Sequence, residues 1–107
     1  RRAFSQVPLG VSAAQAAKRA LGFRSVVNNR PDYEAGPDQP TDAAVRAAAQ
    51  AAGLAYRYLP VPPGYHSPDE VAAMAALLDE LPGPVLAYCR SGARSTRLYV
   101  AALQLRD

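Results

Sequence analysis

The stretch of sequence that decides the fold is PGPVLAYCRSGARS, residues 82–95. Its opening Pro-Gly-Pro ends any preceding helix. Residues 85–88 are then continuously apolar, which is typical of a short strand that is buried on both faces. A polar segment containing one glycine follows and leads into sequence with helical spacing. The stretch therefore predicts a buried strand, a short loop and a helix, in that order.

The same alternation of strands and helices extends through the rest of the chain. Strands are predicted at residues 24–29, 54–61 and 85–88 with an edge strand at 3–7, and helices at 13–21, 43–52, 68–81 and from 94 onward. Strands that alternate with helices favour a parallel sheet. We therefore expect an α/β fold in three layers. Its four- or five-stranded, mostly parallel sheet is flanked by helices, and the last strand lies in its centre.

Two of the helices carry clear local signals. Ser67 with Glu70 three residues later forms a capping box, and Pro68 suits the first helical position. The face of this helix that is predicted to enter the core consists of Val71, Met74, Ala75, Leu78 and Leu81. The inner stripe of the last helix consists of Leu98, Ala101, Ala102 and Leu105.

Length and composition favour a single domain over residues 1–107 with one core. Half of the residues are apolar and 20% are charged, which excludes a disordered or fibrous chain. No apolar run approaches the roughly 20 residues that span a bilayer, and the first residues lack the apolar stretch of a signal peptide. We expect no membrane association. A fusion partner or a separate partner domain is left open.

The charge pattern argues against a nucleic-acid partner. Twelve basic and nine acidic residues give a net charge of +3, and eleven of the bases are arginine. Nucleic-acid binders concentrate basic residues on one face, whereas most of these arginines are dispersed through Ala-rich segments. The exceptions are Arg90, Arg94 and Arg97, which crowd around the one cysteine, Cys89. A small anionic substrate fits this cluster better than a nucleic acid does.

The single cysteine and single histidine limit the other kinds of site. One cysteine excludes an internal disulfide, and a lone cysteine with a lone histidine argues against a zinc site made by the protein alone. We expect no metal and no organic cofactor. A reducing compartment, the cytoplasm, fits this cysteine usage best.

The loop after residue 88 is the predicted catalytic centre. Such a loop can direct successive backbone N–H groups at an anion above a helix N-terminus, and Gly92 permits the turn that this requires. A thiol at Cys89 should then ionise more easily and act as the nucleophile. Arg94 can grip two oxygens of a tetrahedral anion with its planar fork. The loop residues expected to bind substrate are Arg90, Ser91, Gly92, Ala93 and Ser95. The alternative is an inert buried cysteine.

These residues resemble two known groups of proteins. The segment from Tyr88 to Ser95 resembles the active loop of single-domain rhodaneses, in which a glycine follows the cysteine by three residues and an arginine follows that glycine by two. Most of the chain is similar to the phosphatase-like domains of bacterial beta-lactamase hydrolase-like proteins. The segments that carry this second resemblance are 29–32, 52–54, 58–61 and 83–92. It implies the scaffold of dual-specificity phosphatases, in a family whose members are described as phosphatases or as sulfur transferases.

The loop departs from the pattern of cysteine phosphatases. Those enzymes place their arginine six residues after the cysteine, but Ser95 stands at that distance here and Arg94 comes one residue early. Tyr88 also stands where phosphatases have a histidine before the cysteine. A shorter ring of amides suits the outer sulfur of a persulfide better than a phosphoryl group.

A phosphatase also needs an acid to protonate the leaving oxygen. Asp69 lies in the first turn of a well-capped helix, where it suits the helix dipole. His66 is a candidate in a loop that contains proline and glycine, although an exposed bystander is the more ordinary role for such a histidine. Asp32 and Arg30 leave a neighbouring strand at the same edge of the sheet and could reach the site, or Asp32 could simply hold a turn.

The sequence therefore predicts a cysteine-phosphatase-like α/β domain with sulfurtransferase activity. The Cys89 thiolate would take the outer sulfur of thiosulfate or of a low-molecular-weight persulfide and pass it to a thiol or to cyanide. One alternative is a phosphatase that acts through a phosphocysteine at Cys89. A second alternative is a domain that binds anions or senses reactive sulfur without catalysis.

Overall fold

The computed structural model describes residues 23–106 apart from 35, 38, 63 and 90–92. These residues form the strands β1 (Ser25–Asn28), β2 (Ala55–Tyr58) and β3 (Val85–Tyr88), and the helices α2 (Asp42–Ala51), α3 (Pro68–Glu80) and α4 (Ala93–Arg106). All six elements were predicted from the sequence. The predicted strand at 3–7 and the predicted helix at 13–21 lie outside the described residues.

The described sheet is fully parallel, with strand order β2-β1-β3. Val26 of β1 is in register with Tyr56 of β2 and with Leu86 of β3. All four residues of β1 and all four of β3 are buried. Among the described residues, therefore, β1 is the central strand, and β3, which we expected in the centre, pairs on one side only. Strand β3 (VLAY) is the more apolar of the two and β1 (SVVN) is equally buried, so apolar composition does not identify the central strand of the described sheet.

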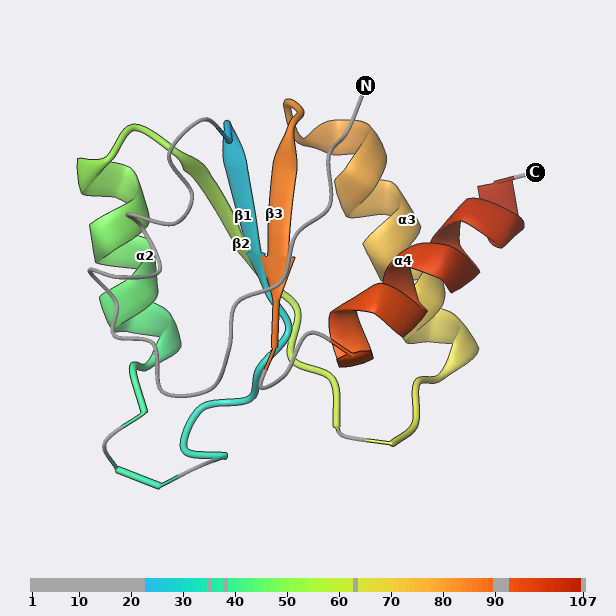
Figure 1. Ribbon diagram of the computed structural model, residues 1–107, viewed down its shortest axis with the longest axis horizontal. Coiled ribbons are helices and arrows are strands. Elements are labelled where there is room, and N and C mark those ends of the chain that lie inside the picture. Colours follow the sequence, from blue (N-terminus) through green and yellow to red (C-terminus); the bar gives the residue numbers. More distant parts are fainter. Residues whose placement is uncertain (1–22, 35, 38, 63, 90–92, 107) are drawn as a thin grey trace.

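Helices cover both faces of the sheet, which gives the expected three layers (Figure 1). Helix α2 lies against one face and packs over a cluster that includes Val26, Val45 and Leu86. Helices α3 and α4 lie side by side on the other face, over a cluster that includes Met74 and Leu98. None of the helices in the described part of the chain is long and apolar enough to cross a bilayer.

The capping box at the start of α3 is confirmed. The Ser67 N–H donates to Oε1 of Glu70 at 2.7 Å, and the Glu70 N–H donates to Oγ of Ser67 at 3.1 Å. This reciprocal pair satisfies donors that a helix start would otherwise leave open. It fixes the point at which the chain leaves the loop after β2 and enters the helix.

Two predicted details differ from the structure. Strand β2 ends at Tyr58 rather than at residue 61, because Pro60 cannot donate to a sheet ladder. The chain still follows β1 beyond that point, since the N–H of Leu59 donates to Asn28 and that of Val61 to Asn29. Leu105 was expected on the inner stripe of the last helix, but it is 58% exposed, because the end of α4 projects beyond the sheet (Figure 1).

Candidate active site

The candidate site lies where the parallel strands end at their carboxyl edge, which is the usual place for a site in an open α/β sheet. The backbone N–H of Asn29 donates to the carbonyl of Tyr88 at 2.9 Å. This bond holds the chain after β1 beside the chain after β3. Arg30 and Cys89, the next residue on each side, therefore leave the sheet as neighbours.

Cys89 directly follows β3 and is 2% exposed. Its thiol lies at the end of a buried strand, four residues before the start of α4. Residues 90–92 lie outside the described residues, so the substrate-binding role expected for Arg90, Ser91 and Gly92 stays a prediction. Ala93 begins α4 and is exposed.

Arg94 is buried in the first turn of α4, with 6% of its surface exposed. Its Nη1 donates to the carbonyl of Val61 at 3.0 Å, and its Nη2 donates to Oε2 of Glu34 at 2.8 Å. Both terminal nitrogens of the fork that we expected to hold substrate thus have protein partners. Among the described residues, Nε of Arg94 has no hydrogen-bond partner.

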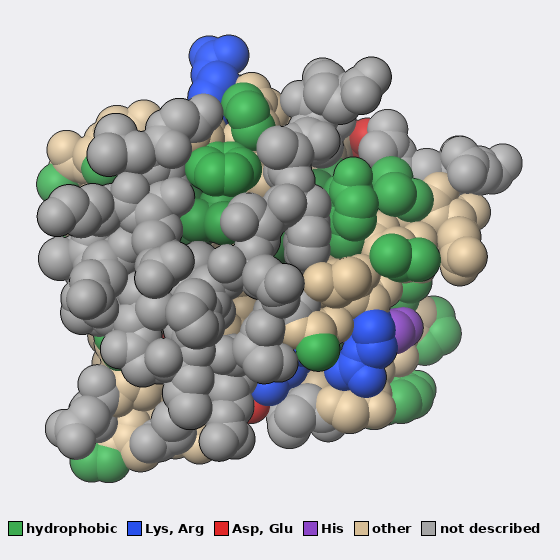
Figure 2. Space-filling view, viewed as in Figure 1, with side chains coloured by type: hydrophobic (Ala, Val, Ile, Leu, Met, Phe, Trp, Pro, Cys, Tyr) green, Lys and Arg blue, Asp and Glu red, His purple; other side chains and the backbone are tan. Residues whose placement is uncertain are grey.

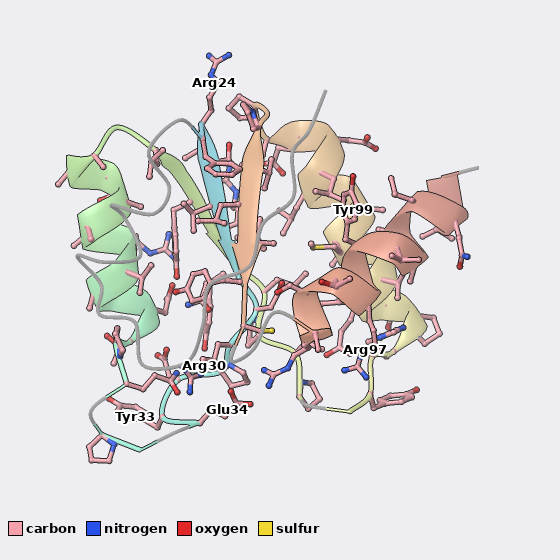
Figure 3. The ribbon with its side chains drawn as sticks, viewed as in Figure 1. Arg24, Arg30, Tyr33, Glu34, Arg97 and Tyr99 are labelled. Atoms are coloured by element: carbon pink, nitrogen blue, oxygen red, sulfur yellow. The ribbon has the colours of Figure 1, made fainter. Side chains whose placement is uncertain are left out.

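Arg30 is a second buried arginine at this edge, with 5% of its surface exposed. Its Nε donates to Oε1 of Glu34 at 3.2 Å, and Figure 3 shows the two side chains together below the end of β1. Its Nη2 lacks a hydrogen-bond partner within the described part of the chain. Arg30 and Arg94 therefore share one carboxylate, that of Glu34.

The sequence did not single out Glu34. Its position depends on the turn after β1, in which the Glu34 N–H donates to the carbonyl of Pro31 at 3.3 Å. Tyr33 in this turn has a φ of 63°, a left-handed backbone conformation that is uncommon for a bulky residue. The only sign of its ion pair in the sequence is that the acidic Glu34 follows the basic Arg30 by four residues.

Ser95 is buried, and its side chain contacts another part of the protein. Its hydroxyl donates to Oδ1 of Asn29 at 2.7 Å, and it is fully buried. Nδ2 of Asn29 in turn donates to the carbonyl of Leu59 at 3.0 Å. These two bonds tie the first turn of α4 to the ends of β1 and β2, so they fix the helix that carries Arg94 relative to the sheet.

Asp32 holds a turn in the structure, which was one of the two roles considered for it. Its Oδ1 accepts the N–H of Asp42 at 2.7 Å, and its own N–H donates to the Tyr58 hydroxyl at 2.9 Å. Asp32 therefore joins the loop after β1 to the start of α2. A catalytic role for its carboxylate stays a prediction.

A network of buried tyrosines surrounds this junction. The Tyr56 hydroxyl donates to Oδ1 of Asp42 at 2.8 Å and accepts from Nδ2 of Asn28 at 3.1 Å. Burial raises the pKa of Tyr56 and that of Tyr88 far above the ordinary value of 10.0. Burial also raises the pKa of Tyr58, more modestly.

The free energy of unfolding should fall steeply above pH 10, because the unfolded chain then loses tyrosine protons that the native protein keeps. Each such tyrosine contributes a slope of about 1.4 kcal/mol per pH unit. Tyr56→Phe should lower the stability at pH 7 by about 1 kcal/mol through its lost hydrogen bonds, and should make the alkaline slope shallower. Urea unfolding between pH 7 and 11 measures both. Tyr33→Phe, at a residue that is 63% exposed, is the control and should leave the stability at pH 7 unchanged.

His66 lines a cavity of about 570 Å³ with Tyr65, Pro68, Val71, Ala101, Gln104 and Leu105. The lining includes none of Cys89, Arg30 and Arg94. Figure 2 shows the histidine, in purple, at the surface between a basic side chain, in blue, and apolar side chains, in green. Asp69, the other acid considered, is exposed in the first turn of α3.

No cluster of side chains among the described residues could hold a metal ion. Of the residues predicted for the site, the structure brings Cys89, Arg94 and Arg30 to one edge of the sheet, and it adds Glu34. Asp32 lies at the same edge but faces α2. His66 belongs to a separate cavity.

Comparison with known proteins gives a consistent result. The family model for the phosphatase-like domain of beta-lactamase hydrolase-like proteins matches residues 3–105. Beta-lactamase hydrolase-like proteins from Agrobacterium fabrum and Xylella fastidiosa are 40% identical over 81 residues and 41% identical over 78 residues. These segments cover 76% and 73% of this chain but only 19% and 18% of the relatives. The chain thus spans about a fifth of the length of these relatives.

A solved structure is also similar. The crystal structure of a candidate phosphatase from Neisseria meningitidis superposes with a TM-score of 0.77 at 28% sequence identity. The match covers 90% of this chain and 68% of the Neisseria protein. The likeness extends well beyond the cysteine loop to nearly all of the fold.

Proposed function

Since the chain belongs to the family of phosphatase-like domains found in beta-lactamase hydrolase-like proteins, we propose that it is an enzyme in which Cys89 attacks a small anionic substrate. The observation that carries this proposal is the pair of buried guanidinium groups at the edge of the sheet where β3 leads into Cys89. Both have an N–H without a partner among the described residues. A thiolate next to such cations is the usual arrangement for a nucleophilic cysteine.

The first candidate reaction is the hydrolysis of a phosphate monoester, which the comparisons favour over sulfur transfer. The Cys89 thiolate would attack phosphorus, and the bond from phosphorus to the ester oxygen would break. That oxygen would leave with the electron pair and take up a proton from water. Water would then hydrolyse the phosphocysteine and release inorganic phosphate, which restores the thiolate.

The second candidate is sulfur transfer, which the length of the loop favours. Arg94 follows Cys89 by five residues, one fewer than in cysteine phosphatases. The carboxylates that the structure describes at this edge are also engaged, since Glu34 binds both arginines and Asp32 holds the start of α2. Sulfur transfer releases no alkoxide, so it needs no acid to protonate a leaving oxygen. The thiolate would attack the outer sulfur of thiosulfate, the sulfur–sulfur bond would break, and sulfite would leave with the electron pair.

One pair of measurements on the purified chain separates these candidates. A phosphatase should release phosphate from an aryl phosphate with many turnovers and should gain no sulfur from thiosulfate. A sulfurtransferase should become one sulfur atom heavier at Cys89 by intact mass after thiosulfate, and should return to its starting mass on addition of cyanide. If neither reaction occurs, the proposal of an enzyme acting on these anions fails, and the non-catalytic alternative of anion binding or sulfur sensing replaces it.

The proposal also includes the compartment of the reaction and the neighbours of the domain. A single cysteine that must stay reduced to react suits the cytoplasm. The relatives are about five times as long as the segment that they share with this chain. We therefore propose that the domain passes its product to, or receives its substrate from, a neighbouring domain or partner protein, with no role for nucleic acid or membrane.

A further inference from the structure

We propose that Arg30 and Arg94 together bind one tetrahedral oxyanion, and that Glu34 is the positioning residue that holds both guanidinium groups in place. This inference deepens the proposed function. It rests on that function only where it identifies the bound anion with the substrate of Cys89.

The two arginines are buried but incompletely satisfied. Their side chains are only 6% and 7% exposed, and a buried charged N–H without an acceptor is strongly unfavourable. Nη2 of Arg30 and Nε of Arg94 have no acceptor within the described residues. An anion that offers two or more acceptor oxygens would satisfy both groups at once.

The charge balance of the two arginines and Glu34 also favours an anion. Glu34 neutralises one of the two guanidinium charges, since its Oε1 lies 3.2 Å from Nε of Arg30 and its Oε2 lies 2.8 Å from Nη2 of Arg94. One positive charge therefore remains between the two side chains. Because Glu34 is itself mostly buried, water screens this charge only weakly.

The two guanidinium groups are held before any ligand arrives. Nη1 of Arg94 is fixed by the carbonyl of Val61, and Nε of Arg30 is fixed by Oε1 of Glu34. Such restraint lowers the entropic cost of binding and favours one ligand geometry. The open N–H groups come from two different arginines, so the site suits an anion with oxygens on more than one side. Phosphate and the sulfonate end of thiosulfate both meet this requirement.

The test measures binding rather than turnover. Inorganic phosphate and thiosulfate are titrated separately, by calorimetry, into the full chain carrying Cys89→Ser, which prevents reaction. Adding Arg30→Gln should weaken binding by roughly tenfold or more, the effect of one lost charge-assisted hydrogen bond. The control is Arg24→Gln. Arg24 is exposed at the opposite end of the sheet, as Figure 3 shows, and its replacement removes the same charge.

The Arg24→Gln control should change the dissociation constant by less than twofold. Equal losses in both variants would show a general effect of net charge and would overturn the proposal. The relative affinity of the two probes distinguishes the source of the anion. Tighter phosphate binding favours a phosphate ester as substrate, and tighter thiosulfate binding favours a sulfur donor.

A second measurement does not depend on whether the Arg30 variant folds. In the unsubstituted protein with labelled arginine, the Nε–H resonance of Arg94 should shift on addition of phosphate and saturate with the calorimetric dissociation constant. An unmoved resonance at saturating phosphate would overturn the proposal. If phosphate binding depends on Arg30 but the unsubstituted protein neither releases phosphate from an aryl phosphate nor gains sulfur from thiosulfate, the proposed function fails and this inference stands. If the unsubstituted protein is an active enzyme but Arg30→Gln leaves the dissociation constant for phosphate unchanged, this inference fails and the proposed function stands.

Discussion

Replacing Cys89 by serine is expected to reduce turnover by roughly 10³-fold or more, whichever of the two reactions the domain performs. A hydroxyl stays protonated at neutral pH and is a much weaker nucleophile than a thiolate. Because Cys89 is buried and serine has nearly the same shape, the fold should be retained. Release of phosphate from an aryl phosphate and formation of thiocyanate from thiosulfate and cyanide are the two assays.

The matched control is the binding of phosphate to the same variant. Serine at position 89 leaves both arginines and Glu34 in place, so phosphate affinity and melting temperature should stay close to those of the unsubstituted protein. Full activity in Cys89→Ser would show that the nucleophile lies elsewhere. A lowered melting temperature would show that activity was lost because the variant does not fold. The test would then be repeated with Cys89→Ala, which has a smaller apolar side chain.

The largest expected effect on stability comes from Glu34→Ala. This change leaves two buried guanidinium groups without their shared carboxylate, and breaking a buried ion pair from one side costs about 3 kcal/mol. The free energy of unfolding, measured with urea at neutral pH, should fall by about that amount. Added phosphate should recover part of the loss, since it offers oxygens to the same N–H groups.

Glu80→Ala provides the comparison for this prediction. Glu80 pairs with Arg57, but both side chains are about half exposed, and exposed ion pairs contribute about 0–1 kcal/mol. If the two variants lost the same small amount of stability, the carboxylate of Glu34 would have no special part in holding the arginines. The proposed anion site would then lose its fixed geometry.

The fold was predictable from the sequence because its signals are local. Pro-Gly-Pro ended one helix, residues 85–88 formed the strand with the predicted bounds, and Ser67 with Glu70 marked the start of α3. Each signal acts over a few residues and depends on backbone chemistry alone. The same locality explains why Cys89 and Arg94 could be assigned to one site, since a strand, a loop and a helix N-terminus follow one another directly.

The partners of those residues were not predictable in the same way. Nη2 of Arg94 reaches Glu34, 60 residues away, and Nη1 reaches Val61, 33 residues away. Such contacts depend on strand order and on the path of loops, which leave no local pattern. Ser95 shows the same limit, because nothing in the loop motif indicates that its hydroxyl binds Asn29, 66 residues away. Its expected contact with substrate stays a prediction.

The left-handed backbone at Tyr33 bears on how the site moves. A bulky residue in this conformation costs roughly 1–2 kcal/mol, and the bond from Glu34 to Pro31 that closes the turn is long at 3.3 Å. Residues 31–34 should therefore open more readily than the sheet beneath them, and they would carry the Glu34 carboxylate away from both arginines. Hydrogen exchange should be faster at the amide of Glu34 than at that of Val27, and equal protection of the two would exclude such opening. Anions could then enter and leave through a brief local unfolding of this turn, while the strands stay paired.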